Sequence, residues 1–249
     1  MTGNFKISEA EHLRSALATY NDRDSLFYRN MKDLTVAAFS GHLNGGSLLE
    51  LGCGWGYCTR DFAALVDRMI SLEGCAEFIE AAQTLASDGK VEFRQMFFEE
   101  IDFIEEFDYV VAANILDHVR DHKQILALCR RALKPGGLIY SVTPNARVFS
   151  RQMAVAMGLM KDIYEILESE RVHGHRRIFD LNLLTGAHRE AGFEILKTGA
   201  LAFKPFADFQ MRAIVEAGLI GEAQLEGLAK MAVIYPDISN GIYVIGRKN

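Results

Sequence analysis

A glycine-rich segment near residue 50 constrains the fold of this chain more than any other feature. It reads Leu48-Leu49-Glu50-Leu51-Gly52-Cys53-Gly54-Trp55-Gly56, an apolar run followed by a glycine at every second position. Glycine reaches backbone conformations that other residues avoid, so such a segment can turn sharply from strand to helix and let backbone approach a ligand closely. In open α/β sheets, ligands bind beyond the carboxyl ends of strands, where this turn lies. The segment therefore predicts a strand–turn–helix unit beside a ligand.

The rest of the chain alternates between the patterns of strands and helices. A helical arm over residues 5–40 comes first and ends at a turn, Asn44-Gly45-Gly46. We expect strands over 48–51, 69–73, 91–95, 107–113, 138–142, 193–197 and 242–246, and helices over 57–66, 76–86, 121–132 and 180–191. Alternation at this spacing is typical of βαβ units in a parallel sheet with helices on both faces.

Two intervals, 146–178 and 203–239, break the alternation. Both contain helical patterns, and we interpret them as lid or substrate insertions that cover an acceptor pocket. The whole chain, 1–249, is then one domain, with an N-terminal arm over 1–44 and a cofactor-binding core over 45–145.

Composition excludes several classes of function. The net charge is −6 and no basic cluster is present, which argues against a nucleic-acid partner. No apolar run approaches the roughly 20 residues that span a bilayer, and the start of the chain lacks the apolar core of a signal peptide, so we expect a cytoplasmic protein with no membrane partner. The four cysteines form no CxxC pair and have no histidine cluster beside them, so we expect no metal site.

Glu73 stands at the end of the second expected strand. A carboxylate there can accept two hydrogen bonds from a ribose diol, although a solvated acid at a strand end is the simpler alternative. A dinucleotide site has the pattern G-x-G-x-x-G. Here the third glycine, Gly56, comes one residue early and Tyr57 takes the dinucleotide position. The glycines alone therefore do not decide between a dinucleotide and another ligand that contains a ribose.

Taken in order, the segments LLELGCGWG, FDYVVAANILDHV and LKPGGLIYSVTPNA, with Glu73 between the first two, resemble the class I S-adenosylmethionine-dependent methyltransferases over roughly residues 45–200. LKPGG before a strand is a specific signal, because nicotinamide dehydrogenases do not normally carry it. A later segment, GHRRIFDLNLLTGAHREAGF, resembles a subgroup that modifies small metabolites or sugars. The resemblance implies a Rossmann-like, mostly parallel seven-stranded sheet with helices on both faces, an antiparallel last strand and helical lid insertions. It also implies S-adenosylmethionine as the cofactor.

The resemblance further implies which residues hold that cofactor. Gly52, Cys53 and Gly54 would pack against its methionine and ribose parts, and Glu73 would hold the ribose hydroxyls. Phe97 and Phe98 would flank the adenine ring, where many family members have an acid instead. Glu50 is also implied as a cofactor-binding residue. Gly74 and Cys75 would lie beside the adenine, and Asn114 would face the sulfonium end. On the arm, the implied residues are Tyr28 and Arg29, with Tyr20. For the arm residues, a helix that only packs on the sheet is an equal alternative.

A base is useful when the methyl acceptor is a hydroxyl or an ammonium, and histidine titrates nearest neutral pH. His118 follows the fourth expected strand, and His173 and His175 close the first insertion, so these three are the candidate catalytic residues. His118 has a structural alternative as a support for its loop. We interpret His188, in an expected helix, as a surface residue.

Arg176, Arg177 and Lys204 are candidates to bind the acceptor. Arginine grips a carboxylate or phosphate with two parallel hydrogen bonds. The alternative for the arginine pair is a loop that docks on the sheet through an arginine–carboxylate contact.

The function that follows is methyl transfer from S-adenosylmethionine to O or N of a small metabolite or sugar-like acceptor. A catalytically silent S-adenosylmethionine-binding module that regulates or scaffolds a partner is the alternative, because methyl transfer has no obligatory catalytic residue. A nicotinamide-dependent oxidoreductase is disfavoured by the early Gly56 and by LKPGG. Whether the chain forms a homodimer stays open.

Overall fold

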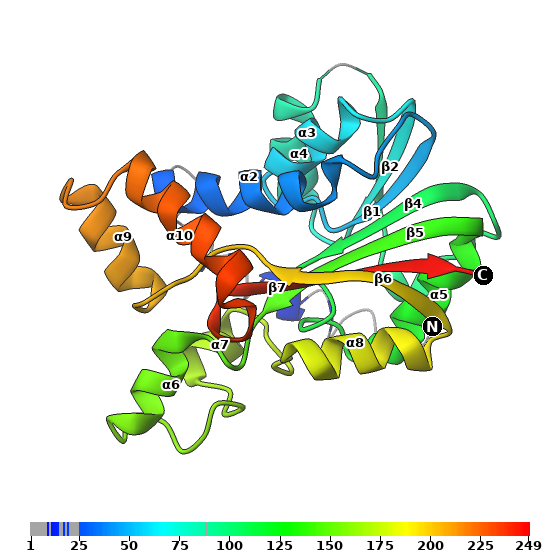
Figure 1. Ribbon diagram of the computed structural model, residues 1–249. Coiled ribbons are helices and arrows are strands. Elements are labelled where there is room, and N and C mark those ends of the chain that lie inside the picture. The colour runs from blue at the N-terminus through cyan, green and yellow to red at the C-terminus, as the bar shows by residue number, and fades with distance from the viewer. Residues whose placement is uncertain (1–8, 10, 15–16, 18, 20–24, 88) are drawn as a thin grey trace.

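A seven-stranded sheet runs through the molecule (Figure 1). The structure is a computed structural model that describes residues 9, 11–14, 17, 19, 25–87 and 89–249. The strands are β1 (Ser47–Leu51), β2 (Arg68–Glu73), β3 (Val91–Gln95), β4 (Phe107–Ala113), β5 (Leu133–Pro144), β6 (Phe193–Ala200) and β7 (Gly241–Lys248). Their order is β3-β2-β1-β4-β5-β7-β6, and β7 alone runs antiparallel to its neighbours. The expected mostly parallel sheet with an antiparallel last strand is confirmed.

Helices cover both faces of this sheet. On one face, α2 (Leu26–Ser40) and α3 (Tyr57–Ala63) bury Phe39 and Phe62 against the strands, and α4 (Ala76–Leu85) packs beside α3. On the other face, α5 (His122–Ala132) and α8 (Leu181–Glu190) bury Leu126 and Leu184. A sheet covered on both sides needs apolar residues at successive positions, and all five residues of β1 are buried.

Aspartate side chains cap two of the expected helices, and one strand is longer than its pattern predicted. The Asp121 carboxylate accepts the backbone N–H groups of Lys123 and Gln124 at the start of α5, and Asp180 accepts that of Leu183 in α8. β5 begins at Leu133 instead of 138, and its register against β4 shifts between Phe107 and Tyr109. LKPGG therefore forms an irregular part of a strand, and it follows the end of α5 directly.

Four helices outside the alternating core lie beyond the carboxyl ends of β4, β5 and β6. They are α6 (Phe149–Ala156), α7 (Glu168–Val172), α9 (Asp208–Glu216) and α10 (Glu222–Ile234), followed by a short 3-10 helix, η2 (Pro236–Ile238). Figure 1 shows α6, α9 and α10 on the same side of the molecule, with α2 reaching toward α9 and α10. The two intervals that break the alternation thus meet in space. Among the described residues, no helix is long and apolar enough to cross a membrane.

His188 does not lie on the surface, so that interpretation was wrong. Its side chain is fully buried, and its two ring nitrogens lie 2.8 Å from the Leu184 carbonyl oxygen and 2.9 Å from the Ser141 hydroxyl. Burial lowers the pKa of His188 to about 4. The reason is helical spacing: His188 is four residues after Leu184, on the face of α8 that meets the sheet.

Gly56, which precedes α3, allows α3 and α4 to approach each other. Its φ is +87°, and a Cβ there would lie 2.6 Å from the Cα of Ala82 in α4. We expect Gly56→Ala to lower the free energy of unfolding by at least about 2 kcal/mol, because strain at positive φ adds to a clash with backbone. Chemical denaturation measures the change.

Gly218→Ala is the matched control. Gly218 also has a positive φ, +68°, but a Cβ there would meet no atom within 4 Å. Only the backbone strain of about 1 kcal/mol then applies. Equal losses for the two variants would contradict the contact between α3 and α4.

Candidate functional site

The turn after β1 contains two glycines in different surroundings. A side chain at Gly52 would meet a neighbouring residue, and a side chain at Gly54 would enter open space. Gly52 has φ +79°, and a Cβ there would lie 2.5 Å from Cδ1 of Ile115. Gly54 has φ +48°, and a Cβ there would meet no atom within 4 Å. Gly54 therefore borders empty space at the carboxyl end of β1, which is the geometry the sequence predicted for close approach to a ligand.

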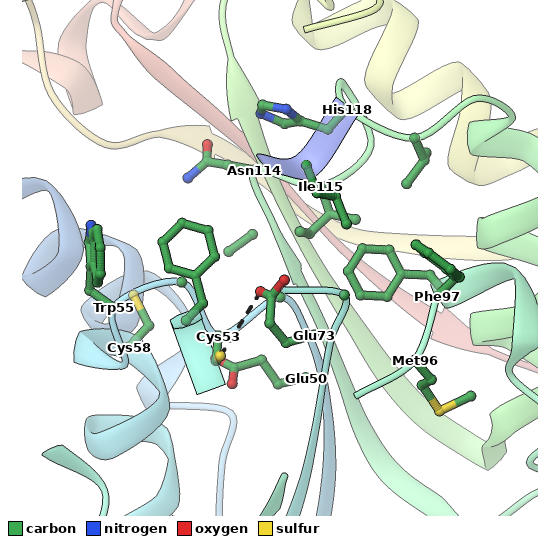
Figure 2. A pocket seen from close by; sticks show the side chains of 18 of the residues that line it. Glu50, Cys53, Trp55, Cys58, Glu73, Met96, Phe97, Asn114, Ile115 and His118 are labelled. Carbon is green, nitrogen blue, oxygen red and sulfur yellow. Dashed lines mark hydrogen bonds between the residues drawn. The ribbon is translucent and has the colours of Figure 1, made fainter. Parts of the chain in front are cut away.

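That space belongs to a cavity beyond the ends of β1, β2 and β4, which we call the first cavity. Figure 2 shows Glu73 and Cys53 near its centre, Trp55 and Phe97 on opposite sides, and Asn114 and His118 at the far end. Its lining includes most of the predicted cofactor residues, namely Glu50, Gly52, Cys53, Gly54, Glu73, Gly74, Phe97, Phe98, Asn114 and Tyr28. Segments far apart in the sequence thus meet at one site.

Glu73 is the buried acid of this cavity. Its side chain is 6% exposed, and one of its carboxylate oxygens accepts the backbone N–H of Cys75 at 3.0 Å. The Cys53 thiol lies 4.0 Å from the other oxygen. Burial raises the pKa of Glu73, against the opposing effect of nearby backbone N–H groups, including those of Cys75 and Gly54. A carboxylate that is buried and held by backbone donors can accept a diol without first having to be ordered.

Glu50 lies below Glu73 and is held by hydroxyl groups. It is 2% exposed, and one of its oxygens accepts hydrogen bonds from Thr59 at 2.8 Å and Ser71 at 2.7 Å. Burial raises the pKa of Glu50 to about 7. These bonds join β1, β2 and α3 beneath the turn, so Glu50 supports the floor of the cavity.

The N-terminal arm covers part of the first cavity. Leu13 lies over Gly74, since a Cβ on Gly74 would be 2.5 Å from its Cδ1. Tyr28 lines the cavity and lies edge-on to Tyr57, with ring centroids 6.1 Å apart. Arg29 is exposed and lines neither cavity described for this chain. Tyr20 lies outside the described residues.

A second cavity lies beneath the lid helices and meets the first. Both cavities are lined by Asn114 and Lys32. Asn114 follows β4 directly and has φ +57°, a conformation that costs energy for a residue other than glycine. Such strain often accompanies a functional position. His173, His175 and Lys204 line the second cavity, while His118 lines the first.

Asp117 brings His118 and His175 together between the two cavities. It is 1% exposed, and its Oδ2 lies 2.9 Å from Nδ1 of His175 and 3.5 Å from Nε2 of His118. The two imidazole rings are 4.5 Å apart. Burial opposes ionisation of Asp117, but the two histidines outweigh it and hold its pKa below the usual range. Burial lowers the pKa of His118 to about 4, whereas Asp117 outweighs burial at His175 and raises its pKa.

Arg176 and Arg177 line neither of these cavities. Arg176 donates to the Glu9 carboxylate at 2.9 Å. Arg177 donates to the carbonyl oxygens of Leu116 at 2.7 Å and Arg120 at 2.6 Å. The arginine–carboxylate contact of this pair therefore joins the loop to the N-terminal arm, and Arg177 joins it to the loop after β4. Lys204 does line the second cavity, where its ammonium group lies 2.7 Å from Asp208.

Comparisons with known proteins agree with this geometry. A family model of a methyltransferase domain matches residues 49–141. A ubiquinone biosynthesis O-methyltransferase from Bradyrhizobium sp. is 34% identical over 131 residues, which is 52% of this chain and 49% of that protein. The chain thus spans about half the length of this relative. Residues 49–141 are thus similar to the class I S-adenosylmethionine-dependent methyltransferases.

Solved structures share the fold of this chain. One is a possible histamine N-methyltransferase from Thermotoga maritima, with a TM-score of 0.65, 17% identity, and coverage of 96% of this chain and 100% of that one. Another is the N-methyltransferase NodS from Bradyrhizobium japonicum in complex with S-adenosyl-L-homocysteine, with a TM-score of 0.58, 12% identity, and coverage of 92% and 91%. At these identities the likeness concerns the fold alone.

The first cavity fits the cofactor that the resemblance implies. Gly54 leaves room at the end of β1, and Glu73 offers a buried carboxylate to a ribose diol. Trp55 and Phe97 supply flat apolar walls. Asn114 stands where this cavity opens into the second one, which is where a transferable methyl group has to be presented.

Sequence reasoning missed three residues of this candidate site. Trp55 packs edge-on against Phe78 with ring centroids 4.8 Å apart, and it lines the first cavity. Lys32 lines both cavities from α2. Asp117 comes four residues after the end of β4 and directly before His118, and a buried acid usually has a partner. Its partner lies far along the chain, so spacing could not reveal it.

Glu50 makes the stability of the protein depend on pH. Its pKa of about 7 in the folded state exceeds the ordinary value of 4.5, so the fold favours the protonated form. The contribution of protonated Glu50 to the free energy of unfolding is therefore fully present below pH 4.5. It is lost as pH rises through about 7, a change of roughly 3 kcal/mol. We expect Glu50→Gln to flatten the fall in unfolding free energy between about pH 5 and 7, as measured by urea denaturation at several pH values.

Some slope will remain in Glu50→Gln because burial raises the pKa of Glu73 as well. Glu216→Gln, at an exposed glutamate in α9, serves as the control and should keep the wild-type profile. A Glu50→Gln profile as steep as that of the wild type would contradict the assignment.

Proposed function

We propose that this protein transfers the methyl group of S-adenosylmethionine to a hydroxyl oxygen of a small molecule bound in the second cavity. The observation that carries the proposal is the meeting of the two cavities at Asn114 and Lys32, with Glu73 in the first and His175 in the second. The cofactor supplies an already activated methyl group, so the protein has to align the acceptor and exclude water.

The lining of the second cavity favours an acceptor with an apolar body. Its apolar lining includes Met31, Val142, Val148, Met160, Leu167 and Leu201, and polar and charged side chains, among them Lys32, Arg151 and Lys204, line the rest. A few polar groups on an apolar wall fix the orientation of a small ligand. Oxygen is favoured as the methyl acceptor because curated relatives are named O-methyltransferases of ubiquinone biosynthesis. A phenolic hydroxyl combines both properties, so simple phenols and catechols are suitable probes.

His175 is the favoured base among the three candidate histidines. It lines the second cavity, and its pKa is raised, which suits proton acceptance. His118 lines the first cavity and has a pKa of about 4, so it is a much weaker base. His173 lines the second cavity too, but the buried carboxylate of Asp117 lies against His175.

Glu73→Ala tests the cofactor part of the proposal. We expect the wild type to bind S-adenosylhomocysteine in calorimetry and Glu73→Ala to bind about tenfold to hundredfold more weakly, because hydrogen bonds from the ribose to a charged acceptor are lost. Glu194→Ala, on the exposed side of β6, is the control and should bind as the wild type does. Unchanged affinity in Glu73→Ala would remove the ribose role, and no binding by the wild type would refute the proposal.

His175→Gln tests the catalytic part. With S-adenosylmethionine and a panel of phenols and catechols, we expect release of S-adenosylhomocysteine to slow by about 10²- to 10⁴-fold, the usual contribution of a general base. Affinity for S-adenosylhomocysteine should be kept. His122→Gln, at a histidine that lines neither described cavity, is the control.

The outcomes separate the alternatives. If affinity and turnover fall together in His175→Gln, the histidine is structural, and if neither falls, it is not the base. A catalytically silent module would bind S-adenosylhomocysteine in the wild type and yet methylate no acceptor.

A further inference from the structure

We propose that Asp117 is a positioning residue for the base, holding His175 with Nδ1 toward its own carboxylate so that Nε2 faces the acceptor. The inference rests on the proposed function, since it concerns the same base. It goes further by giving a role to a residue that neither the cofactor nor the acceptor touches.

The geometry places one ring nitrogen of His175 against Asp117 and leaves the other for the cavity. Nδ1 is sealed from solvent 2.9 Å from Oδ2, although its N–H is not well enough aligned to count as a hydrogen bond. Contacts of this kind in unliganded enzymes often tighten when the substrate binds. His175 also lines the second cavity, so Nε2 is the nitrogen that an acceptor hydroxyl can reach.

Backbone contacts fix the loop of His175 to the loop of Asp117. The His175 N–H donates to the Glu170 carbonyl at 2.9 Å, and the Arg176 N–H donates to the Asp117 carbonyl at 2.8 Å. The Arg177 guanidinium group binds carbonyl oxygens on both sides of Asp117, those of Leu116, Val119 and Arg120. The Arg177 side chain and the Arg176 backbone thus connect the loop of His175 to the loop of Asp117, while the Arg176 side chain binds Glu9.

The charges around His175 favour its protonated form mainly through Asp117. The rings of His118 and His173 lie 4.5 Å and 6.4 Å away. Glu170 and Arg151, which form an ion pair with each other, act in opposite directions on the pKa of His175. Neither carboxylate oxygen of Asp117 has another hydrogen-bond partner among the described residues. A buried carboxylate of this kind stabilises an imidazolium strongly.

The proton balance of methyl transfer uses this arrangement. The acceptor oxygen forms a bond to the methyl carbon while the carbon–sulfur bond breaks and its electron pair stays on sulfur. The hydroxyl proton moves to Nε2 of His175, and the resulting imidazolium is balanced by Asp117, which stays ionised. The proton then leaves to solvent.

Nitrogen NMR of histidine-labelled protein tests the arrangement without an acceptor. In the wild type we expect neutral His175 to carry its proton on Nδ1, and its pKa to lie above 6.5. In Asp117→Asn that pKa should fall by about one unit or more, because an opposite charge nearby is removed. Asp121→Asn is the matched control, since it removes a carboxylate four residues away while asparagine keeps the helix cap, and it should leave the pKa unchanged.

Rate measurements with catechol as the acceptor separate positioning from support of the fold. The rate should rise with pH as His175 loses its proton, and Asp117→Asn should move that rise to lower pH and reduce the plateau by about tenfold or more, but by less than His175→Gln does. In the His175→Gln background, Asp117→Asn should have no further effect.

An Nε2-protonated tautomer in the wild type would overturn the inference, as would an unchanged pKa of His175 in folded Asp117→Asn. If Asp117→Asn does not fold, the wild-type tautomer still decides the question. Dependence of the rate on an added divalent cation, without a shift of the His175 pKa in Asp117→Asn, would also overturn it. Failure of methyl transfer alone would refute the proposed function, while the titration would still report on Asp117 and His175.

Discussion

The close approach of backbone to its neighbours at the end of β1 is the constraint on which the rest of the structure depends. Gly52 passes Ile115 and Gly56 passes Ala82 at distances that leave no room for a Cβ. These contacts set the segment after β4 and helix α4 around the turn. Because both neighbours are fixed in this way, Gly54 is left facing open space, and the cavity has its floor and two of its walls.

Much of the fold and of the cofactor side could be predicted from the sequence, because local signals decide them. The glycine spacing, the apolar strands and the caps at Asp121 and Asp180 each act within a few residues. Glu73 could be placed because it ends a strand next to the turn. The length of β5 could not, since its first residues pair with β4 through an irregular register that LKPGG does not reveal.

The acceptor side was harder because its contacts join residues far apart in the sequence. His188 looked like a surface residue until α8 packed on the sheet and brought it to Ser141. Arg177 looked suited to an anion, but carbonyl oxygens after β4 take its guanidinium group. Asp117 lies 2.9 Å from His175 only because the first insertion folds back over β4. No periodicity or spacing in the sequence records such a contact.

The two sides of the proposed site follow different physical rules. The donor side must accept a single cofactor, so backbone shape and one buried acid, Glu73, determine it. The acceptor side needs only a cavity of suitable lining and a base whose proton affinity matches its task. In the proposed mechanism Asp117 sets that affinity from behind the base, and because His175 itself lies in the first insertion, the contacts of its loop with Asp117 tie that part of the lid to the proton transfer.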